Sequence, residues 1–89
     1  MKGAATQIAS REFDNDFLRL PEGIQTLVQR KIDSMGKRLS SFPHYRMTGS
    51  DKFRLRVGDY RVIYRFDASR GETYLVAIGH RRDIYRDLL

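Results

Sequence analysis

The hydrophobic period of the chain changes near residue 52, and the change separates two kinds of predicted element. From Pro21 to about Leu39, apolar residues recur every three or four positions and form one stripe, as in an amphipathic helix. The stripe comprises Ile24, Leu27, Val28, Ile32, Met35 and Leu39. From Lys52 to Val57, cations alternate with apolar residues, which is typical of a half-buried β-strand.

Gly58 and Asp59 predict a tight hairpin turn after this strand. If the loop is those two residues, the register of the hairpin follows. The predicted apolar pairs are Val57–Tyr60, Leu55–Val62 and Phe53–Tyr64, and the predicted cationic pairs are Arg56–Arg61 and Lys52–Arg65. Like charges directly opposite each other destabilise a sheet. The cationic face of the hairpin is therefore predicted to hold an anion.

Shorter signals predict the remaining elements. Thr6 to Ser10 reads as a short first strand, and Ser10 as the N-cap of a short helix. That helix is expected to bury Phe13, Phe17 and Leu18, and Leu20-Pro21 ends it. Ser40 to Pro43 stops the second helix, and residues 44–51 read as a loop or an extended lead-in.

The C-terminal half contains two further predicted elements. Residues 67–71 form a turn, and Glu72 to Gly79 form a strand that is apolar on both faces and therefore interior to the sheet. Residues 83–89 predict a helical turn or two, with Ile84 and Leu88 facing inward.

The element order is β-α-α-β-β-β with a short C-terminal helical tail. It predicts an α+β fold in which two N-terminal helices cover one face of a small, mostly antiparallel sheet. Tyr64 and Tyr74 are expected in the core. The length of 89 residues predicts one domain, 1–89.

Composition points to an anionic partner. The formal net charge is +6 and the pI about 10.1, which suggests nucleic acid, an acidic protein or an anionic membrane surface. No segment reaches the roughly 20 apolar residues of a membrane span, so no membrane association is expected. The chain has no cysteine and two histidines far apart, so neither a metal site nor another cofactor is expected.

Two sequence blocks carry a resemblance to a known family. Phe53-Arg-Leu-Arg-Val-Gly-Asp-Tyr-Arg-Val-Ile-Tyr64 and Ile78-Gly-His-Arg-Arg-Asp-Ile-Tyr85 follow two predicted helices in a chain of under 100 residues. In order and length the chain resembles the RelE/ParE superfamily of type II toxin–antitoxin toxins. The Gly-Asp-Tyr-Arg and Gly-His-Arg-Arg blocks resemble the RelE branch more than the ParE branch.

The resemblance implies a cytoplasmic, ribosome-dependent endonuclease that cuts mRNA in the A site without a metal. The ribose 2′-hydroxyl would attack the adjacent phosphate and leave a cyclic phosphate. The resemblance also implies a cognate antitoxin, acidic or partly disordered, that blocks the basic face in a hetero-oligomer. The alternatives are a ParE-like inhibitor of DNA gyrase without catalysis and a catalytically dead relative that binds only antitoxin or RNA.

The resemblance assigns the site residues by position. The expected catalytic residues are Arg61, Arg81, His80 and Tyr85, and the expected RNA-binding residues are Lys52, Arg54, Arg56, Arg65 and Arg82. Arginines grip phosphate bidentately and stay protonated, so Arg54 and Arg56 are poor bases. Histidine is the side chain whose unperturbed pKa is near neutral, so His80 is the expected proton-transfer group. Tyr85 is expected to stack on a base or donate a proton.

Each assignment has a structural alternative. The hairpin cations can be the solvated side of an amphipathic sheet. Arg61 can pair with Asp59 or Asp83, and His80 can be a surface residue at a strand end. Tyr85 can anchor the chain to the sheet. His44 is expected to be a loop residue without a catalytic role.

Overall fold

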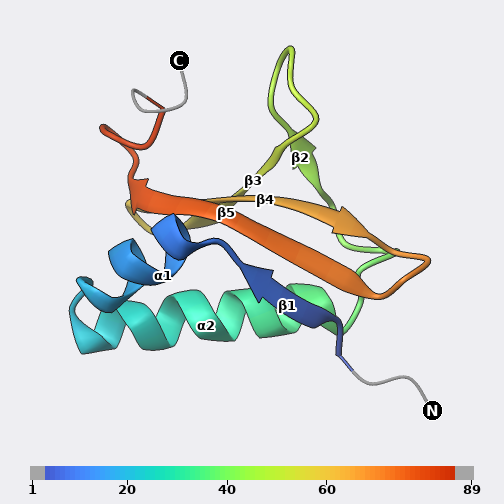
Figure 1. Ribbon diagram of the computed structural model, residues 1–89, viewed down its shortest axis with the longest axis horizontal. Coiled ribbons are helices and arrows are strands. Elements are labelled where there is room, and N and C mark those ends of the chain that lie inside the picture. Colours follow the sequence, from blue (N-terminus) through green and yellow to red (C-terminus); the bar gives the residue numbers. More distant parts are fainter. Residues whose placement is uncertain (1–3, 86–89) are drawn as a thin grey trace.

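The computed structural model describes residues 4–85, which form an α+β fold of two helices and five strands (Figure 1). The elements are β1 (Thr6–Ala9), α1 (Arg11–Leu18), α2 (Glu22–Gly36), β2 (Tyr45–Arg46), β3 (Phe53–Val57), β4 (Tyr60–Asp67) and β5 (Glu72–His80). The strands form one sheet in the order β1-β5-β4-β3-β2, in which only β1 and β5 are parallel. Both helices lie on one face, so the predicted fold class is confirmed.

Ser10 starts α1 and fastens it to the sheet. The backbone N–H of Phe13 donates to Ser10 Oγ at 3.0 Å, and the Ser10 hydroxyl donates to the carbonyl of Val76 at 2.8 Å. Phe13 is buried, but Leu18 is 71% exposed, so its predicted burial is wrong. Leu18 lies five positions after Phe13, roughly 140° further around the helix, and therefore points away from the core.

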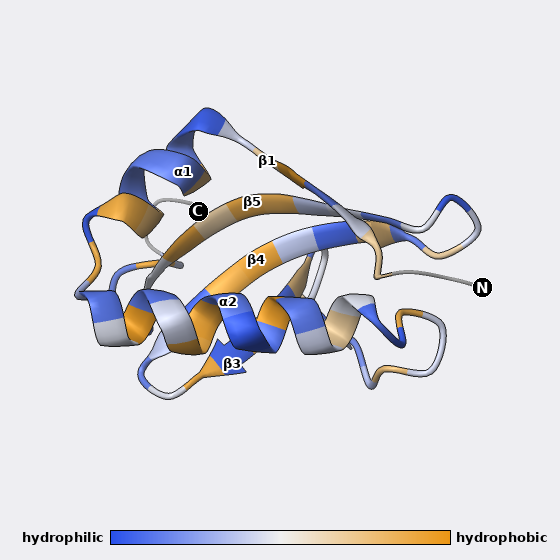
Figure 2. Cartoon of the chain, turned by 90° about the horizontal axis from the view of Figure 1, so that it is seen from below, coloured by the Kyte–Doolittle hydropathy of each residue, from blue (hydrophilic) through white to orange (hydrophobic). Residues whose placement is uncertain are grey.

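The apolar stripe of α2 covers the sheet (Figure 2). Val28, Ile32 and Met35 are buried. Leu27 is 49% exposed, so its predicted place in the stripe is wrong; it lies at the rim of the apolar stripe. The helix ends at Gly36 rather than near Leu39. Gly36 approaches β1 closely, and its carbonyl accepts a hydrogen bond from the Ala5 backbone N–H at 3.0 Å. None of the helices in the described segment is long and apolar enough for a membrane span.

The predicted hairpin register is confirmed for all the residue pairs that lie in the ladder between β3 and β4. Val57 pairs with Tyr60 and Arg56 with Arg61, and the ladder continues to Phe53 and Tyr64. Gly58 has φ +60°, the left-handed conformation that a tight hairpin turn requires and that glycine adopts without strain. Residues 44–51 include the two-residue strand β2, which agrees with the extended alternative for that segment.

The middle of the sheet is buried on both faces. Val62 and Tyr64 point toward the helices, and Ile63 points to the opposite face, yet all three are fully buried. The strand β5 lies between β1 and β4, in agreement with its predicted interior place. Tyr74 is only half-buried and lies outside the core, contrary to prediction, because its neighbours Thr73 and Leu75 are the residues of β5 that face the helices.

The chain after β5 turns back over the open face. The backbone N–H groups of Asp83 and Ile84 donate to the carbonyl of His80 at 2.9 and 3.0 Å. Ile84 is buried, as predicted. The segment to Tyr85 forms turns rather than a regular helix, and the predicted inward position of Leu88 lies outside the described residues.

The buried stripe of α2 yields a stability prediction. Ile32→Ala should lower the free energy of unfolding by about 2–5 kcal/mol, because it leaves a cavity between α2 and the sheet. Leu27→Ala on the same helix is the matched control and should change it by less than about 0.5 kcal/mol. Urea unfolding followed by circular dichroism measures both, and equal losses would contradict the described orientation of α2.

Candidate functional site

The candidate site lies on the face of the sheet opposite the helices. Side chains alternate along β3 and β4, so the residues between the buried apolar positions point to this open face. They include Arg54 and Arg56 on β3 and Arg61 and Arg65 on β4. Arg56 lies directly opposite Arg61, as predicted. The sheet therefore places like charges side by side, and the structure has to relieve their repulsion.

The hairpin turn holds two of the predicted catalytic arginines. The Nη1 atom of Arg61 donates to the carbonyl of Gly58 at 2.8 Å and to that of Tyr60 at 2.9 Å. The Nε atom of Arg81 lies 3.6 Å from the carboxylate of Asp59, and its backbone N–H donates to the Asp59 carbonyl at 2.7 Å. The ion pair that was considered for Arg61 thus belongs to Arg81, and one turn positions both side chains.

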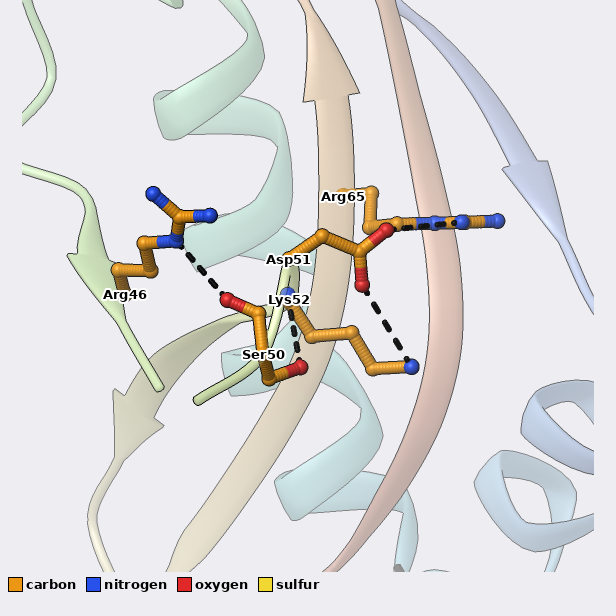
Figure 3. A network of polar contacts seen from close by, with 5 residues as sticks. All are labelled: Arg46, Ser50, Asp51, Lys52 and Arg65. Carbon is orange, nitrogen blue, oxygen red and sulfur yellow. Dashed lines mark hydrogen bonds and ion pairs between the residues drawn. The ribbon is translucent and has the colours of Figure 1, made fainter. Parts of the chain in front are cut away.

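Asp51 neutralises part of the cationic surface (Figure 3). Its carboxylate lies 3.3 Å from Arg65 Nη1 and 3.7 Å from Lys52 Nζ. The hydrogen bond from Arg65, with the nearby charge of Lys52, lowers the pKa of the Asp51 carboxyl below its usual range. Because the ladder ends at Phe53, Lys52 and Arg65 share this carboxylate rather than face each other as a pair in the sheet.

A small loop network supports Asp51. The backbone N–H of Lys52 donates to Ser50 Oγ at 3.0 Å, and the Nε of Arg46 donates to the Ser50 carbonyl at 2.8 Å (Figure 3). The loop of residues 47–52 therefore has a defined shape beside the open face. Spacing alone does not indicate this role of Asp51, because the sequence pattern ascribes the cationic face to β3 and β4 only.

The side chains of Arg54 and Arg56 are available to bind a ligand. Within residues 4–85, neither guanidinium makes an ion pair or a hydrogen bond with another side chain. Arg54 borders a hollow of about 340 Å³ that is also lined by Arg46, Met47, Thr48 and Tyr85. An anion that enters this hollow meets two guanidinium groups, so the hollow can hold phosphate.

Tyr85 reaches this hollow because the chain after β5 folds back. Ile84 packs on Gly79, where an added Cβ would lie 3.2 Å from Ile84 Cδ1. This close approach brings the next residue, Tyr85, to the side of Arg54. The Tyr85 hydroxyl is buried and has no hydrogen-bond partner among the described residues. A buried hydroxyl without a partner is costly.

His80 is separated from these groups. It lies two positions after the buried Ile78, so it points to the helix side of the sheet, and its ring meets Tyr60 edge-on at 5.7 Å. Its Nδ1 accepts a hydrogen bond from the backbone N–H of Arg82 at 3.2 Å. His80 therefore does not share the open face with Arg61. Arg82 is exposed beside it.

His44 forms a buried polar contact that the sequence did not indicate. Its Nε2 donates to the Leu39 carbonyl at 2.8 Å, and its Nδ1 therefore accepts from the Tyr64 hydroxyl at 2.6 Å in the neutral ring. The ring stacks on Phe66 with 3.8 Å between centroids. Burial raises the pKa of Tyr64. His44 lies in a loop, as expected, but anchors that loop to the core.

The chemistry available on the open face is electrostatic. Among residues 4–85 no group of three or more His, Asp or Glu side chains is placed to hold a metal ion. The face offers guanidinium groups for phosphate oxygens and a phenol beside them. These groups can bind a phosphodiester and stabilise added negative charge on it.

Comparison with known proteins identifies one matching family. The sequence matches the family described as "ParE toxin of type II toxin-antitoxin system, parDE" over residues 8–85. No curated protein matches closely enough to count as a relative. The match spans both helices, the last two residues of β1, strands β2 to β5 and the turns that bear the candidate site.

Several solved structures share the fold. A chain of the RelBE2 toxin–antitoxin complex from Mycobacterium tuberculosis has a TM-score of 0.73 and 21% identity, covering 93% of this chain and 98% of that one. A chain of the intact E. coli RelBE complex has a TM-score of 0.72 and 14% identity, and the alignment covers 86% of this chain and 96% of that one. The isolated E. coli RelE toxin has a TM-score of 0.74 and 11% identity, and the alignment covers 96% of this chain and 95% of that one. The family description names ParE and the similar structures contain RelE, so the comparisons do not separate the two branches.

The Asp51 cluster yields a prediction about titration. Arg65→Gln should return the pKa of Asp51 toward its ordinary value, whereas Lys52→Gln should change it less, because the hydrogen bond from Arg65 is the main cause of the shift. The lowered pKa stabilises the fold above the ordinary carboxyl range, and this contribution is lost as pH falls through the folded-state pKa. Carboxyl NMR titration measures both shifts.

Asp67 is the internal control of that titration. Its pKa is lowered by Ser69 and the backbone of Arg70, so neither substitution should move it. An unchanged Asp51 pKa in Arg65→Gln would show that the cluster does not form in solution.

Proposed function

This chain belongs to the ParE toxin family of type II toxin–antitoxin systems, and from the arginines on the open face of its RelE-like fold we propose that it acts as a ribosome-dependent mRNA endonuclease. The chain is a toxin of such a system, with a RelE-like fold. In the proposed activity it enters the ribosomal A site, cuts the mRNA there without a metal ion, and so stops translation. The site of this action would be the cytoplasm.

One observation carries the proposal. Arg54 and Arg56 lie on an open face without internal partners among residues 4–85, beside Arg61 and the buried hydroxyl of Tyr85. Opposed cations destabilise a free protein, so their retention on one face favours a polyanion as the ligand. A phosphodiester matches both the charge and the planar geometry of guanidinium groups.

The proposed reaction follows from these groups. The 2′-oxygen of a ribose attacks the adjacent phosphorus, and the bond to the 5′-oxygen of the next nucleotide breaks. The 2′-hydroxyl gives its proton to water, and the leaving oxygen gains a proton, which leaves a 2′,3′-cyclic phosphate and a 5′-hydroxyl. Arg54, Arg61 and Arg81 would stabilise the extra charge on the phosphorane, with Arg81 held by Asp59.

Proton transfer is assigned to Tyr85. Arginine stays protonated and cannot act as a base at neutral pH. His80 lies on the helix side of the sheet, so in this proposal it positions the turn that carries Arg81 and Arg82. Tyr85 lines the same hollow as Arg54, and in this proposal its hydroxyl donates a hydrogen bond or a proton to a phosphate-bound oxygen.

The proposed partners are a cognate antitoxin, the ribosome and mRNA. Some of the similar structures are complexes of toxin and antitoxin from Mycobacterium tuberculosis, E. coli and Methanococcus jannaschii. An acidic antitoxin would cover the open face and form a hetero-oligomer with this toxin. Lys52 and Arg65, whose charges Asp51 partly neutralises, would contribute less to either partner than Arg54 and Arg56.

A second candidate function is inhibition of DNA gyrase. The matching family is described as the ParE toxin, and His80 is not on the face that carries Arg61. A gyrase inhibitor binds its target without cleaving RNA, so it does not need an assembled catalytic group. The decisive comparison is between mRNA ends and DNA breaks after induction of the toxin in bacteria.

Induction should therefore arrest the incorporation of labelled amino acids and produce in-frame mRNA cuts. Mapping of mRNA 5′ ends reveals the cuts, and purified gyrase is assayed in parallel. Cuts in frame with intact gyrase activity are the expected result. Continued protein synthesis during growth arrest, together with gyrase-linked DNA breaks, would replace the proposal with the second candidate.

Substitutions in the site should affect cleavage more than ribosome binding. Arg61→Ala and Arg81→Ala should each lower single-turnover cleavage by on the order of 10²–10³. Binding should change modestly, because several cations share it. Tyr85→Phe keeps the ring and tests the hydroxyl alone, and His80→Gln should retain most activity. The assay uses mRNA in a programmed ribosome.

Arg70→Ala is the matched control for these arginine substitutions. Arg70 is exposed, lies in the turn between β4 and β5, and pairs with Glu72, so its loss should leave cleavage unchanged. Full activity of an Arg61→Ala, Arg81→Ala double variant would show that the active site lies elsewhere.

A further inference from the structure

A second cationic hollow follows the outer edge of β3 and continues toward α2. Its volume is about 470 Å³. It is lined by Lys31, Arg38, Phe42, Pro43, Tyr45, Arg54, Leu55, Arg56 and Arg61. Every charged residue of this lining is a cation. Lys31 belongs to α2, and Arg38 lies in the turn that follows α2. We call this hollow the β3-edge groove.

The groove exists because β3 is only partly covered. The short strand β2 pairs with Phe53 and Arg54 alone, so among residues 4–85 no strand pairs with the outer side of residues 55–57. Exposed strand edges are normally covered or protected by charge. Here Arg56 provides charge at the edge, and Lys31 of α2 and Arg38 of the following turn add two more cations.

The aromatic residues of the groove are placed for stacking. Tyr45 is a large aromatic residue, yet it is 63% exposed. The guanidinium carbon of Arg38 lies 5.2 Å from the ring centroid of Phe42, so Arg38 is held over Phe42 in the groove. Within residues 4–85, neither Lys31 nor Arg38 takes part in an ion pair.

A cationic groove with exposed aromatic rings suits single-stranded nucleic acid. Cations follow the phosphate backbone, and the rings stack on bases without reading their sequence. We propose that the β3-edge groove binds the single-stranded RNA that flanks the scissile phosphate. The RNA would pass from Arg54 on the open face, across Tyr45, to Lys31 on α2 and Arg38 just after it. This proposal rests on the proposed ribonuclease function.

An acidic protein segment is a less suitable occupant. Such a segment would add as a strand to β3, but the free edge spans only residues 55–57. A strand of that length gives few backbone hydrogen bonds, and it would leave Lys31 and Arg38 beyond its reach along the strand direction. The exposed ring of Tyr45 also offers more to a base than to a carboxylate.

The test compares two charge-matched pairs, each with one residue of α2 and one residue just after it. Lys31→Ala with Arg38→Ala removes two cations of the groove, and Arg30→Ala with Lys37→Ala removes two exposed cations outside its lining. The proteins are made by cell-free synthesis, and circular dichroism confirms their folding. Anisotropy of a short labelled single-stranded RNA is measured over a series of salt concentrations, and a peptide rich in Asp and Glu serves as the second probe.

For RNA, the logarithm of the binding constant falls as the logarithm of the salt concentration rises. The Lys31→Ala, Arg38→Ala pair should make this slope less steep by about 1.4, because two phosphate contacts of about 0.7 each are lost. The control pair should leave the slope near that of the unaltered toxin. Tyr45→Leu should weaken RNA binding about tenfold or more, since one stacked base is lost. Peptide binding should respond equally to both charge pairs.

Three outcomes would overturn the inference. They are equal RNA slopes for the two pairs, unchanged RNA affinity in Tyr45→Leu, and loss of peptide binding in the groove pair with RNA binding retained. None of these depends on cleavage. Absence of mRNA cuts by the unaltered toxin would instead refute the proposed function, so the two failures are distinguishable.

Discussion

The two-residue turn at Gly58 and Asp59 sets the geometry on which the site depends. Its length fixes the register of β3 and β4, and a shift by one residue would move the apolar side chains to the open face and the arginines toward the helices. The same turn supplies the carbonyl that holds Arg61 and the carboxylate that holds Arg81. Register and site geometry therefore have one common origin.

The repulsion between the cations of the open face is relieved at some residues and not at others. Arg61 bonds to backbone carbonyls, and Arg65 and Lys52 share Asp51. Arg54 and Arg56 receive no such contact within residues 4–85. Exposed ion pairs contribute only about 0–1 kcal/mol, so this arrangement matters less for stability than for selecting which cations meet a ligand. Arg54 is central, because it borders both the hollow at Tyr85 and the β3-edge groove.

Local pattern predicted the fold class and the hairpin register, because the period-two alternation and the glycine at position 58 act between neighbouring residues. Local pattern did not predict the exposure of Leu18 and Leu27, because their burial depends on where each helix meets the sheet. The face of His80 depends on the alternation of β5 across a register irregularity near Ile63. The roles of Asp51 and His44 depend on contacts between distant segments, which no short-range pattern encodes.

The parallel pairing of β1 with β5 has a consequence for the order of folding. The Ser10 hydroxyl bonds to the carbonyl of Val76, 66 residues later, and contacts of such separation form late because closing the intervening chain costs entropy. During synthesis α2 therefore emerges with its apolar stripe uncovered until β4 and β5 follow. The cationic face, which needs the same strands, assembles only when most of the chain has left the ribosome. Production of the polypeptide and appearance of its reactive surface are thus separated in time.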